Sequence, residues 1–136
     1  MKVALFGGTG FVGSYITDEL LEHKHKPKLL VRENSTKKLL QADKCDIIEG
    51  DLSNYEAVKK LIKSADVVIY SIGLVREFPH RGITFQETQF EGVKQTVDLA
   101  VELNIKRYIL ISANGAKLDG TKYQSTKYLA EEYLKH

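Results

Sequence analysis

Short apolar runs alternate with segments of helical periodicity along the chain, and this alternation limits its fold more than any other feature. The runs are each about four residues long, end in polar or glycine-bearing turns, and lie at 3–6, 28–31, 46–49, 67–70 and 108–111. Between the first two runs, Val12, Ile16 and Leu20 have the spacing of a helix that buries one face. Because parallel strands need crossover connections of about a dozen residues, the pattern predicts an α/β fold with a doubly wound parallel sheet of about five strands.

The predicted strands are almost entirely apolar, as expected when helices cover both faces of a parallel sheet. Further one-sided helical patterns span 55–62, 93–101 and 126–133. Ser53 and Glu56 have the spacing of a capping box, which predicts the start of the helix that follows 46–49. A length of 136 residues without an internal repeat or linker predicts one domain.

Composition argues against several classes of function. The chain has 20 Lys and Arg against 18 Asp and Glu, so a net charge of +2 predicts no general attraction to nucleic acid or anionic membranes. One cysteine, Cys45, excludes an intramolecular disulfide and a multi-cysteine metal site, and fits a reducing compartment. His23 and His25 lack partners spaced to complete a metal site. The apolar runs are far shorter than the roughly 20 residues of a membrane span, so we expect a soluble, cytoplasmic protein.

A glycine-rich turn directly follows the first apolar run. It comprises Gly7, Gly8, Thr9, Gly10, Phe11, Val12 and Gly13. Glycine lets the backbone approach a pyrophosphate closely, while free N–H groups and the positive end of the helix favour the anion. A tight turn with close helix packing would also use glycine. A predicted strand before the turn and a predicted helix after it favour dinucleotide binding.

The spacing Gly-x-x-Gly-x-x-Gly resembles that of the extended and atypical branches of the short-chain dehydrogenase/reductase superfamily. Asp51 and Leu52, after the third run, resemble the acidic-Leu pair that such proteins place against the adenine ring. Ser71, Ile72 and Gly73, after the fourth run, resemble the turn that lines the cofactor. The resemblance covers essentially the whole chain, and it implies a Rossmann domain over residues 1–136 that binds NAD(P).

Residues 82–93 resemble a narrower group, the nucleotide-binding accessory subunit of respiratory complex I and its bacterial relatives. Proteins of the superfamily continue beyond the helix expected near 126–133, through further strands and a substrate-binding region. The resemblance therefore implies that this chain is the N-terminal portion of a longer protein and that the C-terminal substrate-binding region is absent.

The choice of cofactor depends on the end of the second predicted strand. Arg32 stands 19 residues after Gly13, where an acidic residue usually binds the ribose 2′-hydroxyl of NAD and an arginine can pair with the 2′-phosphate of NADP. Lys37 and Lys38 could add positive charge, whereas Glu33 could serve NAD if the strand ended one residue later. We predict NADP rather than NAD.

Tyr123 and Lys127 form a Tyr-x-x-x-Lys motif after the fifth run. Side chains four residues apart share a helix face, so the ammonium can favour the phenolate. In the resembled family the tyrosine transfers a proton to or from a substrate oxygen, and the lysine also holds the ribose. Tyr55 and Lys59 have the same spacing, but we interpret them as a core tyrosine and a surface lysine away from the nicotinamide end.

The neighbours of this motif depart from the family pattern. Relatives usually have a Ser or Thr just after the fifth strand to hold the substrate oxygen, where this chain offers Ser112 and Asn114. Gln89 stands where many relatives have Asn.

Two functions therefore remain open. One is an NADP-dependent oxidoreductase or epimerase acting on a carbonyl or alcohol, with Tyr123 as acid or base.

The other is a non-catalytic NAD(P)-binding redox sensor or an accessory subunit of an electron-transfer complex. The expected partners are a dinucleotide and either a small-molecule substrate or a protein complex, and both functions are compatible with a homo-oligomer.

Overall fold

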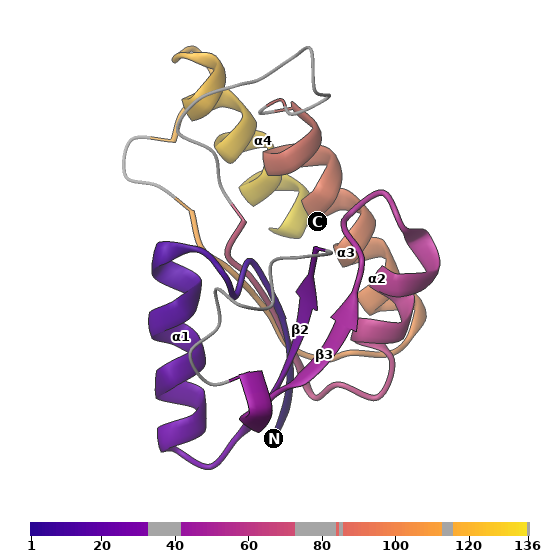
Figure 1. The fold of residues 1–136 in the computed structure, drawn as a ribbon. Helices are drawn as coiled ribbons and strands as arrows, with labels where there is room; N and C mark the ends of the chain where they lie inside the picture. The colour runs from indigo at the N-terminus through magenta and orange to yellow at the C-terminus, as the bar shows by residue number, and fades with distance from the viewer. Residues whose placement is uncertain (33–41, 73–83, 85, 113–115, 136) are drawn as a thin grey trace.

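The computed structural model describes residues 1–32, 42–72, 84, 86–112 and 116–135. Within this part of the chain, five parallel strands form one sheet in the order β3-β2-β1-β4-β5 (Figure 1). The strands are β1 (Lys2–Phe6), β2 (Lys26–Val31), β3 (Asp46–Glu49), β4 (Val67–Tyr70) and β5 (Tyr108–Leu110). The predicted Rossmann-like α/β fold is confirmed.

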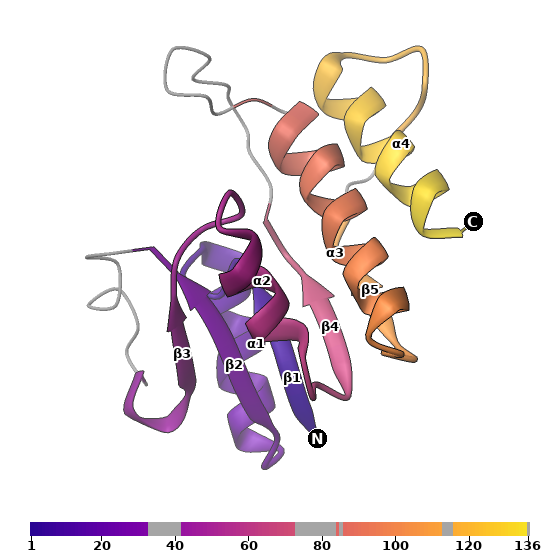
Figure 2. The same ribbon diagram turned by 90° about the vertical axis from the view of Figure 1, so that its right-hand side faces the viewer.

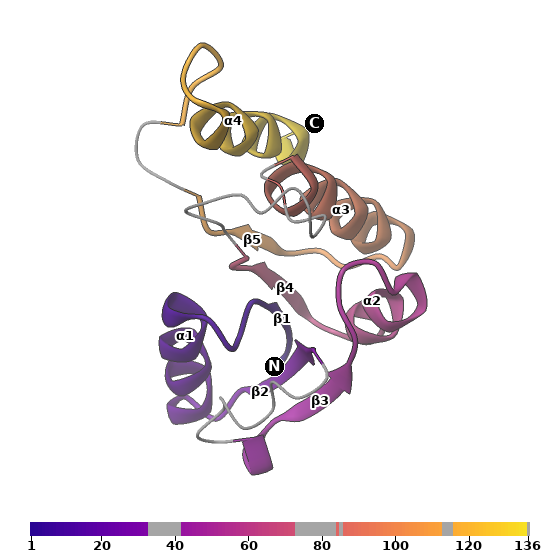
Figure 3. The same cartoon turned by 45° about the horizontal axis from the view of Figure 1, so that its top comes forward.

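Helices cover both faces of the sheet (Figures 2 and 3). Helix α1 (Phe11–Glu22) lies on one face, and α2 (Tyr55–Ile62) and α3 (Gly92–Glu102) lie on the other. Helix α4 (Lys122–Lys135) packs against α3 and against η4 (Gln86–Glu91), a π-helix that leads into α3. A short 3₁₀ turn, η2 (Ala42–Lys44), precedes β3.

The core consists of two apolar clusters, one on each face of the sheet. Successive residues of a strand point to opposite faces, so β1 and β4 contribute to both clusters. The α1 side includes Val3, Leu5, Leu29, Val31, Val67 and Ile69. The α2 and α3 side includes Ala4, Phe6, Val68, Tyr70, Leu61, Ile62, Val93 and Leu99. Burial on both faces explains why these strands are apolar throughout.

Candidate functional site

The turn between β1 and α1 is closed by glycines that the fold itself requires. Gly7 has a φ of +91°, and a Cβ there would lie 2.8 Å from the carbonyl carbon of Ser71. A Cβ at Gly13 would lie 1.8 Å from the carbonyl oxygen of Gly7, so α1 can approach the turn only with glycine at this position. Gly8 is buried, and a Cβ there would lie 2.9 Å from the side chain of Leu29 in β2. The N–H of Gly10 donates to the Gly7 carbonyl at 3.1 Å.

Gly10 itself is different, because nothing in the described part of the chain requires glycine there. A Cβ would meet only the Gly7 carbonyl oxygen, at an ordinary 3.5 Å, and the backbone angles of φ −78° and ψ 176° suit any residue. Gly10 is the N-cap of α1, without a side-chain cap or an acidic residue in the first turn. Thr9 is half-buried, and Phe11 and Val12 are exposed. The helix N-terminus therefore offers space and backbone N–H groups that fit a phosphate.

Ser71 lies beside this turn, at the end of β4. Its N–H donates to the Phe6 carbonyl at 2.8 Å, which ties the two strand ends together. Its side-chain hydroxyl is buried and has no hydrogen-bond partner among the described residues. Buried hydroxyls normally have a partner, so this group fits a ligand atom at the turn. Ile72 is half-buried, and Gly73 lies outside the described residues.

A cavity of about 820 Å³ lies at the ends of β2 and β3. Its lining is Arg32, Glu49, Gly50, Asp51, Ser53, Asn54, Tyr55, Glu56 and Ala57. Arg32 is exposed, while Leu52 is half-buried and packs against the core. Glu33, Lys37 and Lys38 lie outside the described residues. A basic side chain and several hydrogen-bonding groups thus meet in a hollow large enough for part of a nucleotide.

The predicted capping box at Ser53 and Glu56 is wrong. Helix α2 has Asn54 as its N-cap, and the Asn54 Oδ1 accepts the Asp51 N–H at 3.0 Å. The backbone N–H and hydroxyl of Ser53 both donate to the Asp51 carboxylate instead. Those hydrogen bonds lower the pKa of Asp51, as does the positive charge of Arg32. Ser53 therefore hydrogen-bonds within the turn at Asp51 and does not cap helix α2.

This turn predicts a specific response to acid. A carboxylate whose pKa is lower in the folded state stabilises the protein above its unfolded pKa of about 3.9, and that contribution is lost as the pH falls through the folded value. We expect the urea midpoint of Asp51→Asn to lie below that of the wild type at pH 7 and the difference to narrow towards about pH 3. A difference that stays constant over this range would contradict the assignment.

Tyr55 is not the core tyrosine that the sequence predicted. It is 46% exposed, because it is the first residue of α2 and lines the cavity beside β2 and β3 rather than the sheet face. Lys59 is half-buried. The two Tyr-x-x-x-Lys pairs lie on different helices, α2 and α4.

Tyr123 and Lys127 lie about one turn apart on α4. Lys127 is only 4% exposed, and its Nζ donates to the carbonyl oxygen of Ile111 at the end of β5, at 3.2 Å. Burial lowers the pKa of Lys127, and the negative charge of Glu131 acts in the opposite direction. Tyr123 is half-buried. A lysine placed in this way is anchored at the sheet edge where β5 ends.

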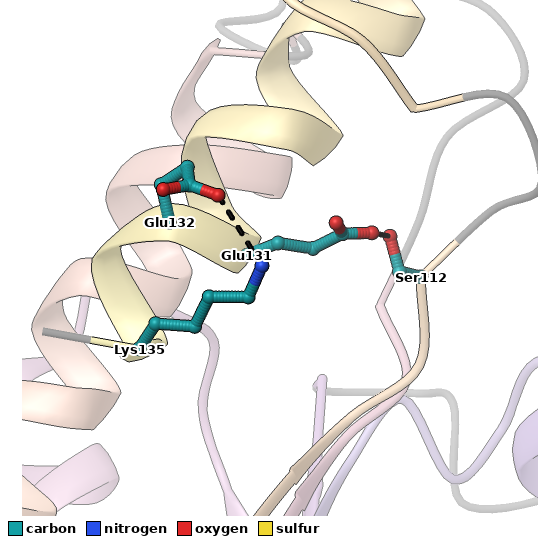
Figure 4. Close-up of polar contacts among 4 residues, drawn as sticks. All are labelled: Ser112, Glu131, Glu132 and Lys135. Atoms are coloured by element: carbon teal, nitrogen blue, oxygen red, sulfur yellow. Dashed lines mark hydrogen bonds and ion pairs between the residues drawn. The ribbon is translucent and has the colours of Figure 1, made fainter.

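Ser112 and Glu131 form a contact that the sequence reasoning missed. The Ser112 hydroxyl donates to Glu131 Oε1 at 2.5 Å, which joins the end of β5 to α4 (Figure 4). Asn114 lies outside the described residues. Spacing could have identified Glu131, since it follows Lys127 by four residues and so shares its helix face.

Gln89, which stands where many relatives have Asn, joins the π-helix η4 to α4. It is fully buried, and its Nε2 donates to Thr126 Oγ1 at 2.9 Å and to the Tyr123 carbonyl at 3.5 Å. The π-helix that carries Gln89 is itself held by Tyr70, whose hydroxyl donates to the carbonyl of Thr88. The first turn of α4 is therefore fixed by contacts from the core.

All these groups lie along one edge of the sheet, where the parallel strands end. The strand order reverses between β1 and β4, so the glycine turn and Ser71 lie at the topological switch point. Arg32 and Asp51 follow the strands on one side of it, and Ser112 follows β5 on the other. In open α/β sheets this crevice is the usual ligand site. In the described residues, no three His, Cys, Asp or Glu side chains are grouped to hold a metal ion, and no helix has both the length and the apolarity needed to cross a membrane.

The chain is similar in sequence to reductases. It is 28% identical over 115 residues to a ceramide reductase from Caulobacter vibrioides, an alignment that covers 85% of this chain and 35% of that protein. It is 35% identical over 80 residues to an isoflavone reductase homolog from Nicotiana glauca, covering 53% of this chain and 26% of the relative. The chain thus spans about a third or less of these relatives.

Similarity to solved structures covers nearly the whole chain. A putative NAD-dependent epimerase/dehydratase from Bacillus halodurans has a TM-score of 0.84 at 27% identity, over 99% of this chain and 64% of that one. The Bordetella bronchiseptica enzyme WbmH, solved with NAD⁺, has a TM-score of 0.82 at 20% identity, over 98% of this chain and 51% of that one, and shows the same fold. The model of one NAD(P)H-binding family matches residues 7–136, and the protein therefore belongs to that family.

Proposed function

We propose that the protein binds NADP(H) along this edge of the sheet and serves a reductase or epimerase that acts on a carbonyl or alcohol. One observation carries the proposal: the fold leaves space at Gly10, the N-cap of α1. Gly7, in the same turn, lies against the backbone of Ser71, whose buried hydroxyl has no partner among the described residues. Both features fit a bound pyrophosphate and its neighbouring groups, and together they explain a glycine that the chain does not otherwise need.

The proposed cofactor site extends from this point in both directions. The backbone of the glycine turn would bind the phosphates, and Asp51 and Leu52 would lie against the adenosine portion. Ser71, Ile72 and Gly73 would line the path towards β5, and Lys127 would hold the second ribose. Arg32 would pair with a 2′-phosphate, since it is exposed beside the cavity at the ends of β2 and β3.

The preference for NADP predicts a selective effect of Arg32→Gln. Loss of charge-assisted hydrogen bonds to the 2′-phosphate should raise the Kd for NADPH about 10- to 100-fold and leave the Kd for NADH nearly unchanged. Arg107→Gln is a matched control, because Arg107 is exposed at the opposite, N-terminal end of β5. Calorimetric titration with each dinucleotide gives both constants. Tighter binding of NADH than of NADPH by the wild type would contradict the preference.

The proposed chemistry depends on α4. A bound nicotinamide cofactor supplies or accepts the hydride. Tyr123 would give a proton to the substrate oxygen or take one from it, and the buried Lys127 would keep positive charge close to the tyrosine and the ribose. Consumption of NADPH over a panel of aldehydes, ketones and unsaturated carbonyl compounds tests this role. Turnover of one class of substrate would support it.

A second candidate, a non-catalytic redox sensor or accessory subunit, is favoured by one contact. The Ser112 hydroxyl, a group suited to hold a substrate oxygen, donates to Glu131 instead. In that case the cofactor would stabilise the fold and the protein would present a surface to its complex. Binding of NADPH without consumption on any substrate would favour this candidate over the enzyme.

A further inference from the structure

Glu131 occupies a distinctive place on α4. It follows Tyr123 and Lys127 at intervals of four residues, so the three side chains share one helix face. Its carboxylate is half-buried and accepts the Ser112 hydroxyl, which holds it over the end of β5 (Figure 4). Neither the glycine turn nor the cavity beside β2 uses this residue.

Lys127 is attached to the same end of β5. Its Nζ donates to the carbonyl of Ile111, the residue before Ser112. Two hydrogen bonds therefore join α4 to this strand end. In one the helix donates, from Lys127 to the Ile111 carbonyl, and in the other the strand end donates, from Ser112 to Glu131. A buried ammonium is costly unless a negative charge lies near it, and a carbonyl supplies only a partial charge.

We propose that Glu131 is a positioning residue for Lys127: held by Ser112, its carboxylate provides the countercharge that keeps the buried ammonium protonated and fixes α4 at the end of β5. The inference rests on the proposed function, in which Lys127 holds the cofactor ribose. It adds a residue to the site that the Tyr-x-x-x-Lys motif does not include.

The charges around Lys127 support this assignment. Burial lowers the pKa of Lys127, and Glu131 is the charged group that raises it. On α4, Tyr123 precedes Lys127 by one turn. On the packed elements η4 and α3, the carboxylates of Glu91 and Asp98 are hydrogen-bonded to Gln86 and Tyr133, respectively. The end of β5 contributes the uncharged Ser112.

Glu132 provides a matched control on the same helix. It carries the same charge one residue further on, and its Oε1 pairs with Nζ of Lys135 at 3.3 Å, away from β5 (Figure 4). Glu131→Gln and Glu132→Gln therefore remove the same charge from neighbouring positions. The amide of Glu131→Gln can still accept the Ser112 hydroxyl, so the variant separates charge from hydrogen bonding.

The test has two readouts. An NMR titration of the Lys127 side chain should show a lower pKa in Glu131→Gln than in the wild type and no comparable change in Glu132→Gln. The Kd for NADPH, measured from pH 6 to pH 9, should start to rise at a lower pH in Glu131→Gln and should be about 3- to 10-fold above the wild-type value near pH 9, with little difference near pH 6.

Each outcome decides the proposal. Equal titrations and equal pH profiles for the two glutamate variants would overturn it. If Glu131→Gln does not fold, Ser112→Ala keeps the charge but frees the carboxylate; a smaller shift in the same direction would support the proposal, and an unchanged titration would overturn it. Failure of the wild type to bind either dinucleotide would refute the proposed function, while the NMR titration would still decide the role of Glu131.

Discussion

Gly13→Ala is expected to lower the free energy of unfolding by about 3 kcal/mol or more. The new methyl carbon would lie 1.8 Å from the carbonyl oxygen of Gly7, and backbone must move to relieve such a contact. The displaced segment is the start of α1, which covers one face of the sheet. Urea denaturation followed by circular dichroism measures the loss.

Gly10→Ala is the matched variant. It is expected to weaken NADPH binding and to leave stability nearly unchanged. Its methyl group has room, so stability should change by less than about 1 kcal/mol. Because the methyl would occupy the proposed phosphate position, the Kd for NADPH should rise at least about tenfold. A Gly10→Ala protein that binds NADPH as tightly as the wild type would remove the phosphate assignment, even if Gly13→Ala unfolds as expected.

Tyr123→Phe is expected to reduce kcat by a factor of about 10² to 10⁴ on any substrate that the wild type turns over. The variant keeps the aromatic ring and removes the hydroxyl that would transfer the proton. Because the proposed cofactor contacts come from other residues, the Kd for NADPH should change little. Steady-state consumption of NADPH, together with a binding titration, separates the two effects.

Tyr55→Phe is the control for this prediction. Tyr55 belongs to the other Tyr-x-x-x-Lys pair, on α2, and lines the cavity at the ends of β2 and β3. Because Tyr55 lines the proposed nucleotide cavity, the comparison is made at saturating NADPH. Under that condition Tyr55→Phe should leave kcat within about twofold of the wild-type value, because general acid–base transfer needs a group within hydrogen-bond reach of the substrate. Similar losses in both variants would contradict a specific role of Tyr123, and turnover retained in Tyr123→Phe would exclude it as the acid or base.

The sheet was predictable from the sequence because its strands are apolar on both faces. The residues at which the strands begin and end were harder to predict. The run at 28–31 was placed after Pro27, which lacks a backbone N–H, yet β2 starts at Lys26. Pro27 is opposite Val3 of β1, whereas pairing with β3 begins only at Lys28. At Pro27 the strand β2 therefore has only β1 as a paired neighbour, a position where a residue without an N–H is tolerated. At the other edge of the sheet, β5 ends at Leu110, one residue before the end of the predicted run at 108–111.

The candidate site was predictable where one chain segment supplies the geometry, as at the glycine turn. It was not predictable where side chains from distant segments meet. The bridge from Gln89 to Thr126 joins residues 37 positions apart, and the Ser112 to Glu131 contact joins residues 19 apart. The capping box at Ser53 also failed, because the backbone N–H and the hydroxyl of Ser53 donate to the Asp51 carboxylate.

Titration of the wild-type chain with NADPH, and separately with NADH, tests the central claim most directly. We expect saturable binding of one dinucleotide per chain, with NADPH bound more tightly. No detectable binding of either dinucleotide up to about 1 mM would contradict the assignment of the glycine turn and Ser71 as a dinucleotide site.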